Sequence, residues 1–260
     1  MKKPIGIILS GYGLNCEEET AHAFQIAGAQ AEIVHINDLI KGLVKLDKYQ
    51  IMAFPGGFSY GDDLGSGKAY ALKFKNHLQK DLDRFSQRDT LIIGICNGFQ
   101  ILTHLNLLTG TLTFNTSARY LDRWVDLKIE SESPWLRNIK TLSCPIAHGE
   151  GRFHANKKIL KDLKQNKMIA ARYYNGEMSA LYNLDPNPNG SLDNIAGITD
   201  RTGRILGIMP HPERAMYFTQ LPHWTYLKEK LIRKSVKNKR NLPTYGPGLK
   251  IFKNAVSYFL

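Results

Sequence analysis

The chain has 260 residues, of which 35 are Lys or Arg and 23 are Asp or Glu, so its formal net charge is +12. Apolar residues make up 43% of it, which is enough to bury a core and excludes an intrinsically disordered protein. It has no heptad repeat, no Gly-X-Y repeat and no apolar run of the roughly 18–20 residues that a membrane span needs, which excludes coiled-coil, collagen and membrane-spanning classes.

The first half of the chain alternates short apolar runs with amphipathic stretches. The apolar runs predict strands at 5–10, 31–36, 51–54 and 90–95, and the stretches between them predict helices at 17–27, 68–85 and 97–105. Strands that alternate with helices form βαβ units, so we expect a mostly parallel open sheet with helices on both faces. Glycine-rich stretches at 11–13, 56–67 and 94–98 follow strand ends, where such sheets bind ligands.

The second half predicts strands at 125–129, 195–199 and 204–209, and a last helix at 249–259. Gly203 is placed to turn a hairpin between the last two strands, which adds a small antiparallel β element to the α/β fold. Because there is no internal repeat or low-complexity linker, we expect a single domain over residues 1–260.

The sharpest motif is a cysteine between a buried strand and a helix, in Gly94-Ile95-Cys96-Asn97-Gly98. A tight strand-turn-helix needs small flanking residues, because the nucleophile at its tip has a strained backbone. The helix N-terminus favours a thiolate there, and the backbone N–H of Asn97 can bind an oxyanion. We therefore expect Cys96 to be a nucleophile; the alternative is a buried structural cysteine.

A thiol nucleophile needs a base, and His211 is the best candidate among eight histidines. It follows the apolar run 205–209 in Pro210-His211-Pro212-Glu213, and alternate residues of an extended chain point the same way. Glu213 can therefore orient the imidazole and stabilise its charged form. The order Cys, His, Glu along the chain differs from the Ser, acid, His order of the α/β-hydrolases.

A second oxyanion donor should come from another strand end, and Pro55-Gly56-Gly57-Phe58 offers Gly57. A glycine lets the backbone approach a substrate closely.

The number and spacing of the cysteines indicate the compartment: Cys16, Cys96 and Cys144 make an odd number without CxxC spacing. We therefore expect no disulfide framework and no metal site, and a reduced, cytoplasmic location.

Together these motifs resemble the class I, or triad, glutamine amidotransferases. Within them, the closest resemblance is to the glutaminase part of phosphoribosylformylglycinamidine synthases, also called formylglycinamide ribonucleotide amidotransferases. The matching stretches span nearly the whole chain: GYGLNCEEE (11–19), PGGFSYGDDL (55–64), GICNGFQIL (94–102), PIAHGEGRF (145–153), NPNGS (187–191) and MPHPERA (209–215). The resemblance implies a flavodoxin-like sheet.

The resemblance also implies a role for each matching residue. Cys96 is expected to be the nucleophile, His211 the base and Glu213 its orienter, with oxyanion N–H groups from Gly57 and Asn97. The expected glutamine-binding residues are Gln100, His148, Gly149, Gly151 and Phe153. Cys16 matches a family position, and we expect it to begin a helix without chemistry of its own.

The implied reaction releases ammonia from glutamine through a Cys-glutamyl thioester. Ammonia then passes to a synthetase partner, with or without a small accessory subunit, and that partner uses ATP and Mg²⁺ to make formylglycinamidine ribonucleotide in purine biosynthesis. This chain has no G-x-x-x-x-G-K-[ST] loop, so we expect no cofactor in it. Two features depart from the stand-alone bacterial subunit: Gly65 stands where Arg is usual, and the 246–255 ending is more similar to the long single-chain enzyme.

Two other functions are open at this point. One is a different cysteine hydrolase on a similar sheet, of the DJ-1/PfpI type, which lacks the His-Pro-Glu arrangement after a late strand. The other is a nucleic-acid-binding protein with vestigial motifs, because residues 228–240 carry seven basic residues and one Glu. That stretch lacks interleaved aromatic residues and any recognition motif, so nucleic acid is not the expected partner.

Overall fold

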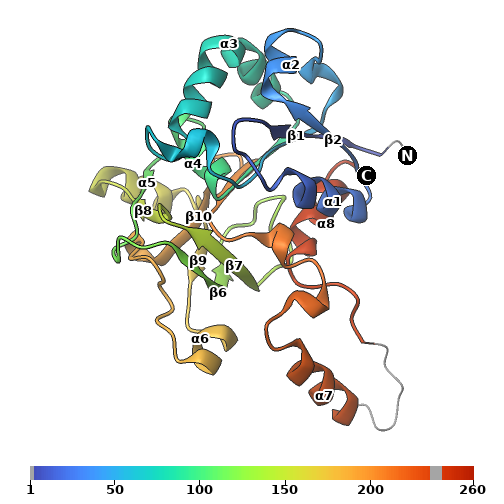
Figure 1. Ribbon diagram of the computed structural model, residues 1–260, viewed down its shortest axis with the longest axis vertical. Helices are drawn as coiled ribbons and strands as arrows, with labels where there is room; N and C mark the ends of the chain where they lie inside the picture. Colours follow the sequence, from blue (N-terminus) through green and yellow to red (C-terminus); the bar gives the residue numbers. More distant parts are fainter. Residues whose placement is uncertain (1–2, 235–241) are drawn as a thin grey trace.

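A computed structural model of the protein describes residues 3–234 and 242–260 (Figure 1). Across these ranges a nine-stranded sheet has the order β2-β1-β3-β4-β11-β10-β9-β6-β7. Its strands are β1 (Ile5–Ser10), β2 (Gln30–His35), β3 (Ile51–Phe54), β4 (Leu91–Ile95), β6 (Leu121–Ile129), β7 (Thr141–His148), β9 (Ile169–Tyr173), β10 (Ile195–Thr199) and β11 (Ile205–Ile208). A separate antiparallel pair joins β5 (Thr111–Thr113) to β8 (Arg152–His154).

The large sheet has a parallel part and an antiparallel part. Strands β2, β1, β3, β4 and β11 run parallel, whereas β10, β9, β6 and β7 add antiparallel pairs. Every residue of β3, β4 and β11 is buried, as expected for parallel strands covered on both faces. The order 2-1-3-4 followed by β11 is that of a flavodoxin-like sheet, so the predicted fold class is confirmed.

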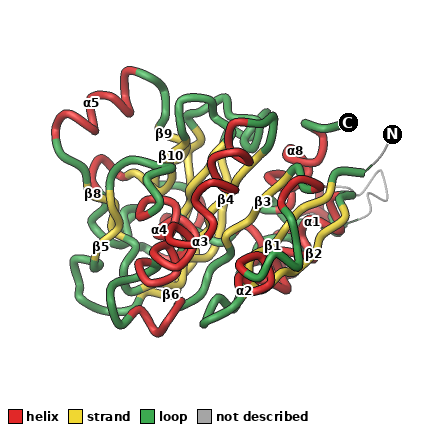
Figure 2. The backbone as a smooth tube through the Cα atoms, turned by 90° about the horizontal axis from the view of Figure 1, so that it is seen from above, coloured by secondary structure: helices red, strands yellow, loops and turns green. Residues whose placement is uncertain are grey.

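Helices cover both faces of this sheet (Figures 1 and 2). They are α1 (Glu17–Ala27), α2 (Ile36–Ile40), α3 (Lys68–Gln87), α4 (Asn97–His104), α5 (Lys157–Gln165), α6 (Glu177–Tyr182), α7 (Trp224–Lys234) and α8 (Leu249–Ser257). Helix α1 packs against α8, and α3 packs against α4. In α3 the buried residues recur every three or four positions from Ala71 to Phe85, which is the apolar stripe of an amphipathic helix.

Most elements of the first half lie where the sequence predicts them. The hairpin at Gly203 is also confirmed: β10 and β11 are antiparallel, and Gly203 has φ +71°. The elements without a prediction are β7 and β9 of the large sheet, the small pair β5 and β8, and helices α2, α5, α6 and α7. Strand β7 contains Pro145, which usually argues against a strand; it is accommodated because β7 is an edge strand.

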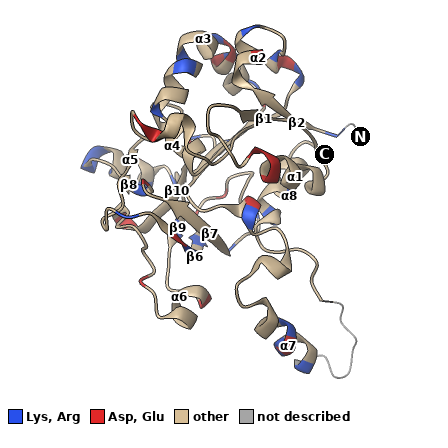
Figure 3. Ribbon diagram, in the orientation of Figure 1, with Lys and Arg blue, Asp and Glu red and all other residues tan. Residues whose placement is uncertain are grey.

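Helix α7 projects away from the sheet in Figure 1, and Figure 3 shows Lys and Arg gathered along it. It carries the first part of the basic stretch 228–240; residues 235–240 lie outside the described residues. None of the helices formed by the described residues is long and apolar enough to cross a membrane.

Candidate active site

The register of the sheet brings the two central motifs together. Strand β11 lies beside β4, with Ile208 paired to Ile95, and the backbone N–H of Cys96 donates to the carbonyl of Ile208 at 2.8 Å. Cys96 follows Ile95 directly, and His211 comes three residues after Ile208. Both therefore stand at the carboxyl edge of the parallel strands, where α/β sheets bind ligands.

Cys96 has the strained backbone that the motif predicts. Its φ of +52° and ψ of −107° lie outside the regions favoured for a residue with a side chain. The flanking glycines are required by close contact: a Cβ at Gly98 would lie 1.8 Å from the Phe54 carbonyl oxygen, and one at Gly94 would lie 2.5 Å from the Gly98 oxygen. The turn therefore places the thiol at the start of α4, as expected of a nucleophile elbow.

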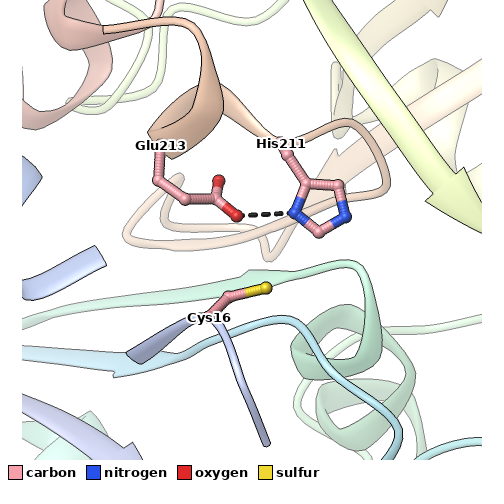
Figure 4. Close-up of side chains that lie close together, drawn as sticks. All are labelled: Cys16, His211 and Glu213. Atoms are coloured by element: carbon pink, nitrogen blue, oxygen red, sulfur yellow. Dashed lines mark hydrogen bonds and ion pairs between the residues drawn. The ribbon is translucent and has the colours of Figure 1, made fainter. Parts of the chain in front are cut away.

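His211 and Glu213 form a buried pair. Nδ1 of His211 lies 2.5 Å from Oε1 of Glu213, and the side chains are 2% and 0% exposed (Figure 4). The backbone N–H of His211 donates to the carbonyl of Pro145 in β7 at 2.8 Å, which fixes the histidine against the sheet. Within the described part of the chain, Nε2 makes no hydrogen bond of ordinary geometry. That nitrogen is therefore available to the nucleophile or the substrate.

The surroundings of His211 stabilise its charged form. Burial lowers the pKa of His211, but the charges of Glu213 and Cys96 and hydrogen bonding with the Cys16 and Cys96 sulfurs raise it, with the net result well above the ordinary value. The proximity of Cys96 is part of this effect. A thiol beside an imidazole that holds its proton strongly is the arrangement of a Cys-His nucleophile.

The peptide between Gly56 and Gly57 is held in one orientation. The backbone N–H groups of Asn15 and Cys16 both donate to the carbonyl of Gly56, at 3.1 and 3.2 Å, and Phe58 N–H donates to Gly13 at 2.9 Å. Because C=O and N–H point in opposite directions in a trans peptide, the Gly57 N–H is turned away from Asn15 and Cys16. Two donors on one carbonyl also strengthen the N–H of that peptide as a donor.

Asn97 offers the second candidate N–H. It is the first residue of α4, so its N–H has no acceptor inside the helix. Its side chain ties the elbow to its surroundings: Oδ1 accepts from Ser59 N–H at 3.2 Å, and Nδ2 donates to Gln100 Oε1 at 2.8 Å and to Asp62 Oδ1 at 3.3 Å. Burial raises the pKa of Asp62, and the charge of Glu150 raises it further.

Of the predicted glutamine-binding residues, Gln100 lies in α4 and the other four lie in the segment from the end of β7 to β8, which Gln100 contacts. Gln100 Nε2 donates to the carbonyl of Glu150 at 2.5 Å. His148 is buried, its Nδ1 lies 3.1 Å from Asn115 Oδ1, and burial together with the charge of His211 lowers its pKa to about 3. A Cβ at Gly149 would meet open space, so this part of the loop has room beside it.

The rest of the loop points inward. A Cβ at Gly151 would lie 2.2 Å from the His148 ring, and Phe153 is buried with its ring stacked on Phe99 at 6.4 Å. Asn189, from the 187–191 motif, donates through Nδ2 to the carbonyl of Gly151 at 2.8 Å. The motif thus supports the loop through a hydrogen bond that sequence spacing alone does not predict.

The residue that the sequence analysis did not connect with the chemistry is Cys16. Its sulfur lies beside the His211–Glu213 pair in Figure 4, and it accepts a hydrogen bond from Arg214 Nη2 at 2.9 Å. A Cβ at Gly56 would lie 3.0 Å from this sulfur and 2.7 Å from the His211 ring. The only signal in the sequence was its place in the 11–19 motif.

Among the described residues, Cys16, His211 and Glu213 are also the only group of three or more His, Cys, Asp or Glu whose ligand atoms lie close enough to hold a metal ion, all within 4.8 Å of one another. The separation of 2.5 Å between His211 Nδ1 and Glu213 Oε1 is that of a shared proton. Two ligands that each lie about 2.0–2.2 Å from a zinc ion would stand farther apart. We therefore interpret the group as a hydrogen-bonded network.

Comparisons with known proteins agree with this geometry. The profile of the CobB/CobQ-like glutamine amidotransferase domain matches residues 3–259. The phosphoribosylformylglycinamidine synthase subunit PurQ of Methanococcus maripaludis (strain C5) is 48% identical over 270 residues, 98% of either chain. The subunit of the same name from Dehalococcoides mccartyi is 40% identical over 271 residues, 99% of this chain and 98% of that one.

Solved structures give the same picture. A chain in the structure of PurLQS from Thermotoga maritima is 30% identical, with a TM-score of 0.71 and full coverage of both chains. A glutamine amidotransferase of Thermotoga maritima shares the fold at 14% identity, with a TM-score of 0.52, over 91% of this chain and 87% of that one.

Proposed function

The chain belongs to the family of CobB/CobQ-like glutamine amidotransferase domains, and on that premise we propose that it is the glutaminase subunit of phosphoribosylformylglycinamidine synthase. It hydrolyses glutamine and delivers ammonia to a synthetase partner in purine biosynthesis. The observation that carries this proposal is the buried His211–Glu213 pair beside the strained Cys96 elbow, in a chain 48% identical to a named subunit.

The proposed reaction proceeds in two stages. The Cys96 thiolate attacks the side-chain amide carbon of glutamine, and the N–H groups of Gly57 and Asn97 bind the resulting oxyanion. The His211 imidazolium gives its proton to the leaving nitrogen, so ammonia departs and a γ-glutamyl thioester remains. The neutral imidazole then takes a proton from water, which attacks the thioester and releases glutamate and the thiolate. Glu213 keeps the ring oriented throughout.

Glutamine selection is assigned to the loop beside the elbow. Gln100, His148, Gly149, Gly151 and Phe153 are the proposed binding residues. The open space at Gly149 and the contact of Gln100 with the carbonyl of Glu150 support a subsite there. Gln100, His148 and Phe153 are buried, so we propose that they shape the subsite from beneath while Gly149 faces the substrate.

The remaining assignments concern the whole protein. We propose that residues 1–260 form one glutamine amidotransferase domain, a proposal supported by the profile match over 3–259. ATP and Mg²⁺ are assigned to the synthetase partner. A cytoplasmic location is supported by three free cysteines. A DJ-1/PfpI-type hydrolase and a nucleic-acid-binding protein are not favoured, because the family match covers the chain and includes the His211–Glu213 pair.

The test is an assay of the chain with its synthetase partner, co-purified from native extract. We expect amidine formation with either glutamine or ammonia as nitrogen donor, and we expect the free chain to hydrolyse glutamine more slowly than the complex. The proposal is wrong if the complex makes the amidine from ammonia but never from glutamine, whatever the glutamine concentration.

A further inference from the structure

We propose that Cys16 is a positioning residue for the catalytic pair: its sulfur holds the Arg214 guanidinium away from the Glu213 carboxylate, so that the carboxylate stays paired with His211. The consequence for turnover rests on the proposed glutaminase function. The contacts of Cys16 with Arg214 and with the His211–Glu213 pair are observed in the structure and do not depend on that function.

The sulfur of Cys16 lies against the His211–Glu213 pair. Cys16 precedes α1 and is 1% exposed. Its Sγ lies within 4.8 Å of a ring nitrogen of His211 and a carboxylate oxygen of Glu213, and Figure 4 shows it beneath the bond that joins them. The backbone N–H of Cys16 donates to the carbonyl of Gly56, so the residue also belongs to the framework of the proposed oxyanion peptide.

Glu213 can attract cations other than the imidazolium of His211. Oε2 of Glu213 is buried and has no hydrogen-bond partner among the described residues, which leaves an anionic oxygen able to attract a cation. The nearest cation in sequence is Arg214, which instead donates to Cys16 Sγ through Nη2 at 2.9 Å and to Glu19 Oε1 through Nε at 3.2 Å. These two acceptors hold the guanidinium, and among the described residues no hydrogen bond or ion pair joins it to Glu213, although the charge of Glu213 helps to raise the pKa of Arg214.

A neutral thiol suits the position of Cys16. Burial raises the pKa of Cys16, hydrogen bonding with His211 lowers it, and the charge of Glu213 raises it, with a net increase. The group is therefore a neutral thiol at physiological pH. A neutral sulfur is a weak acceptor, so it can accept from Arg214 and contact His211 while Glu213 remains the stronger acceptor for the His211 proton. A carboxylate at this position would compete with Glu213.

His211 is faced by charged or titratable groups from several elements. They are Glu213 and Arg214 after β11, Cys96 at the elbow, Cys16 before α1, His148 on β7 and Tyr120 before β6. Cys144 of β7 is buried, and burial together with the charge of Glu213 raises its pKa well above the ordinary value. Of these groups, Cys16 is the one that joins Arg214 to the pair, so its removal should change the proton affinity of His211.

The test is the pH dependence of Cys96 alkylation by iodoacetamide in the full chain, with the labelled peptide identified by mass spectrometry. This reaction reports the Cys96–His211 ion pair and needs no glutamine turnover. In Cys16→Ala, Arg214 is released toward Glu213, the imidazolium is less stable, and the midpoint of the profile should move to higher pH. Loss of one hydrogen bond corresponds to about half to one pH unit.

Two further variants separate positioning from packing. Cys16→Ser keeps an acceptor for Arg214, so its midpoint should return toward that of the unsubstituted chain. Cys144→Ala removes an equally buried thiol that does not contact Arg214, so its profile should not move. An unmoved midpoint in Cys16→Ala, or an equal shift in Cys144→Ala, would overturn the proposal. If the complex cannot use glutamine, the proposed glutaminase function is rejected. The alkylation profile would still decide whether Cys16 positions the His211–Glu213 pair.

Discussion

Nδ1 of His211 lies 2.5 Å from Oε1 of Glu213, and both side chains are removed from solvent. Burial alone would make the imidazole neutral, so the charges of Glu213 and Cys96 must outweigh it to give the raised pKa of His211. The carboxylate thus has two tasks, orientation of the ring and stabilisation of its proton.

His211→Ala should lower kcat/KM for glutamine by about 10²–10⁴-fold, because it removes the proposed general acid and base. Glu213→Gln should lower it less, since an amide can still orient the ring although it no longer stabilises the imidazolium. Because the pKa of His211 then falls, the alkaline limb of the plot of kcat/KM against pH should move to lower pH. Steady-state kinetics across pH check both points, and a larger loss in Glu213→Gln would reject its role as orienter.

Cys96→Ala should abolish glutamine-dependent amidine synthesis by the complex while ammonia-dependent synthesis survives. The substitution removes the proposed nucleophile, but it leaves the synthetase partner and its own chemistry untouched. Parallel assays with the two nitrogen donors measure this. Retention of the original glutaminase rate would show that another residue attacks the substrate.

Gly57→Ala should reduce glutaminase activity by about 10²–10³-fold, the cost of one lost oxyanion donor. Gly57 has φ +149°, and a Cβ there would lie 2.5 Å from the Gly13 carbonyl oxygen, so the peptide must move. Gly65→Ala is the matched control, because Gly65 also has a positive φ of +98° but open space around its Cβ. It should cost only about 1–2 kcal/mol of stability. Equal activity in both variants would argue against Gly57 as a donor.

His148 should make the fold sensitive to acid. The pKa of His148 is lowered to about 3 in the folded protein, whereas a histidine in the unfolded chain has a pKa of about 6.5. The stability that its neutral form contributes is fully present above pH 6.5 and is lost as pH falls toward 3. Because of this group, the free energy of unfolding should fall by up to about 1.4 kcal/mol for each pH unit. His148→Gln should therefore flatten the fall in the free energy of unfolding between pH 6 and 4.

Urea unfolding at several pH values measures that slope, and His77→Gln, at an exposed position of α3, is the control. The control should keep the slope of the unsubstituted chain. If His148→Gln kept it too, a different buried group would be responsible for the acid sensitivity.

The local motifs could be interpreted from sequence because their geometry is set by neighbouring residues. The elbow at Cys96 is fixed by Gly94 and Gly98, and the spacing of His211 and Glu213 already allows their contact. The parallel strands were predictable because burial on both faces makes them continuous apolar runs. Their carboxyl ends could then be expected to carry the site.

Other parts depend on contacts between distant segments. Cys16 and Arg214 are 198 positions apart, and only the sheet order brings the start of α1 beside the turn after β11. Asn115 carries no motif, yet it bonds to both His148 and Gly151. Strand β7 was missed because Pro145 interrupts its pattern, which an edge strand tolerates.

The most direct test of the central claim is to trap the thioester. The complex is mixed with radiolabelled glutamine, quenched in acid during turnover, digested and analysed by mass spectrometry. We expect one γ-glutamyl group on the peptide that contains Cys96, and none in Cys96→Ala. A glutamyl group on the peptide of Cys16 or Cys144, or glutamate release at full rate with no labelled peptide, would contradict the account.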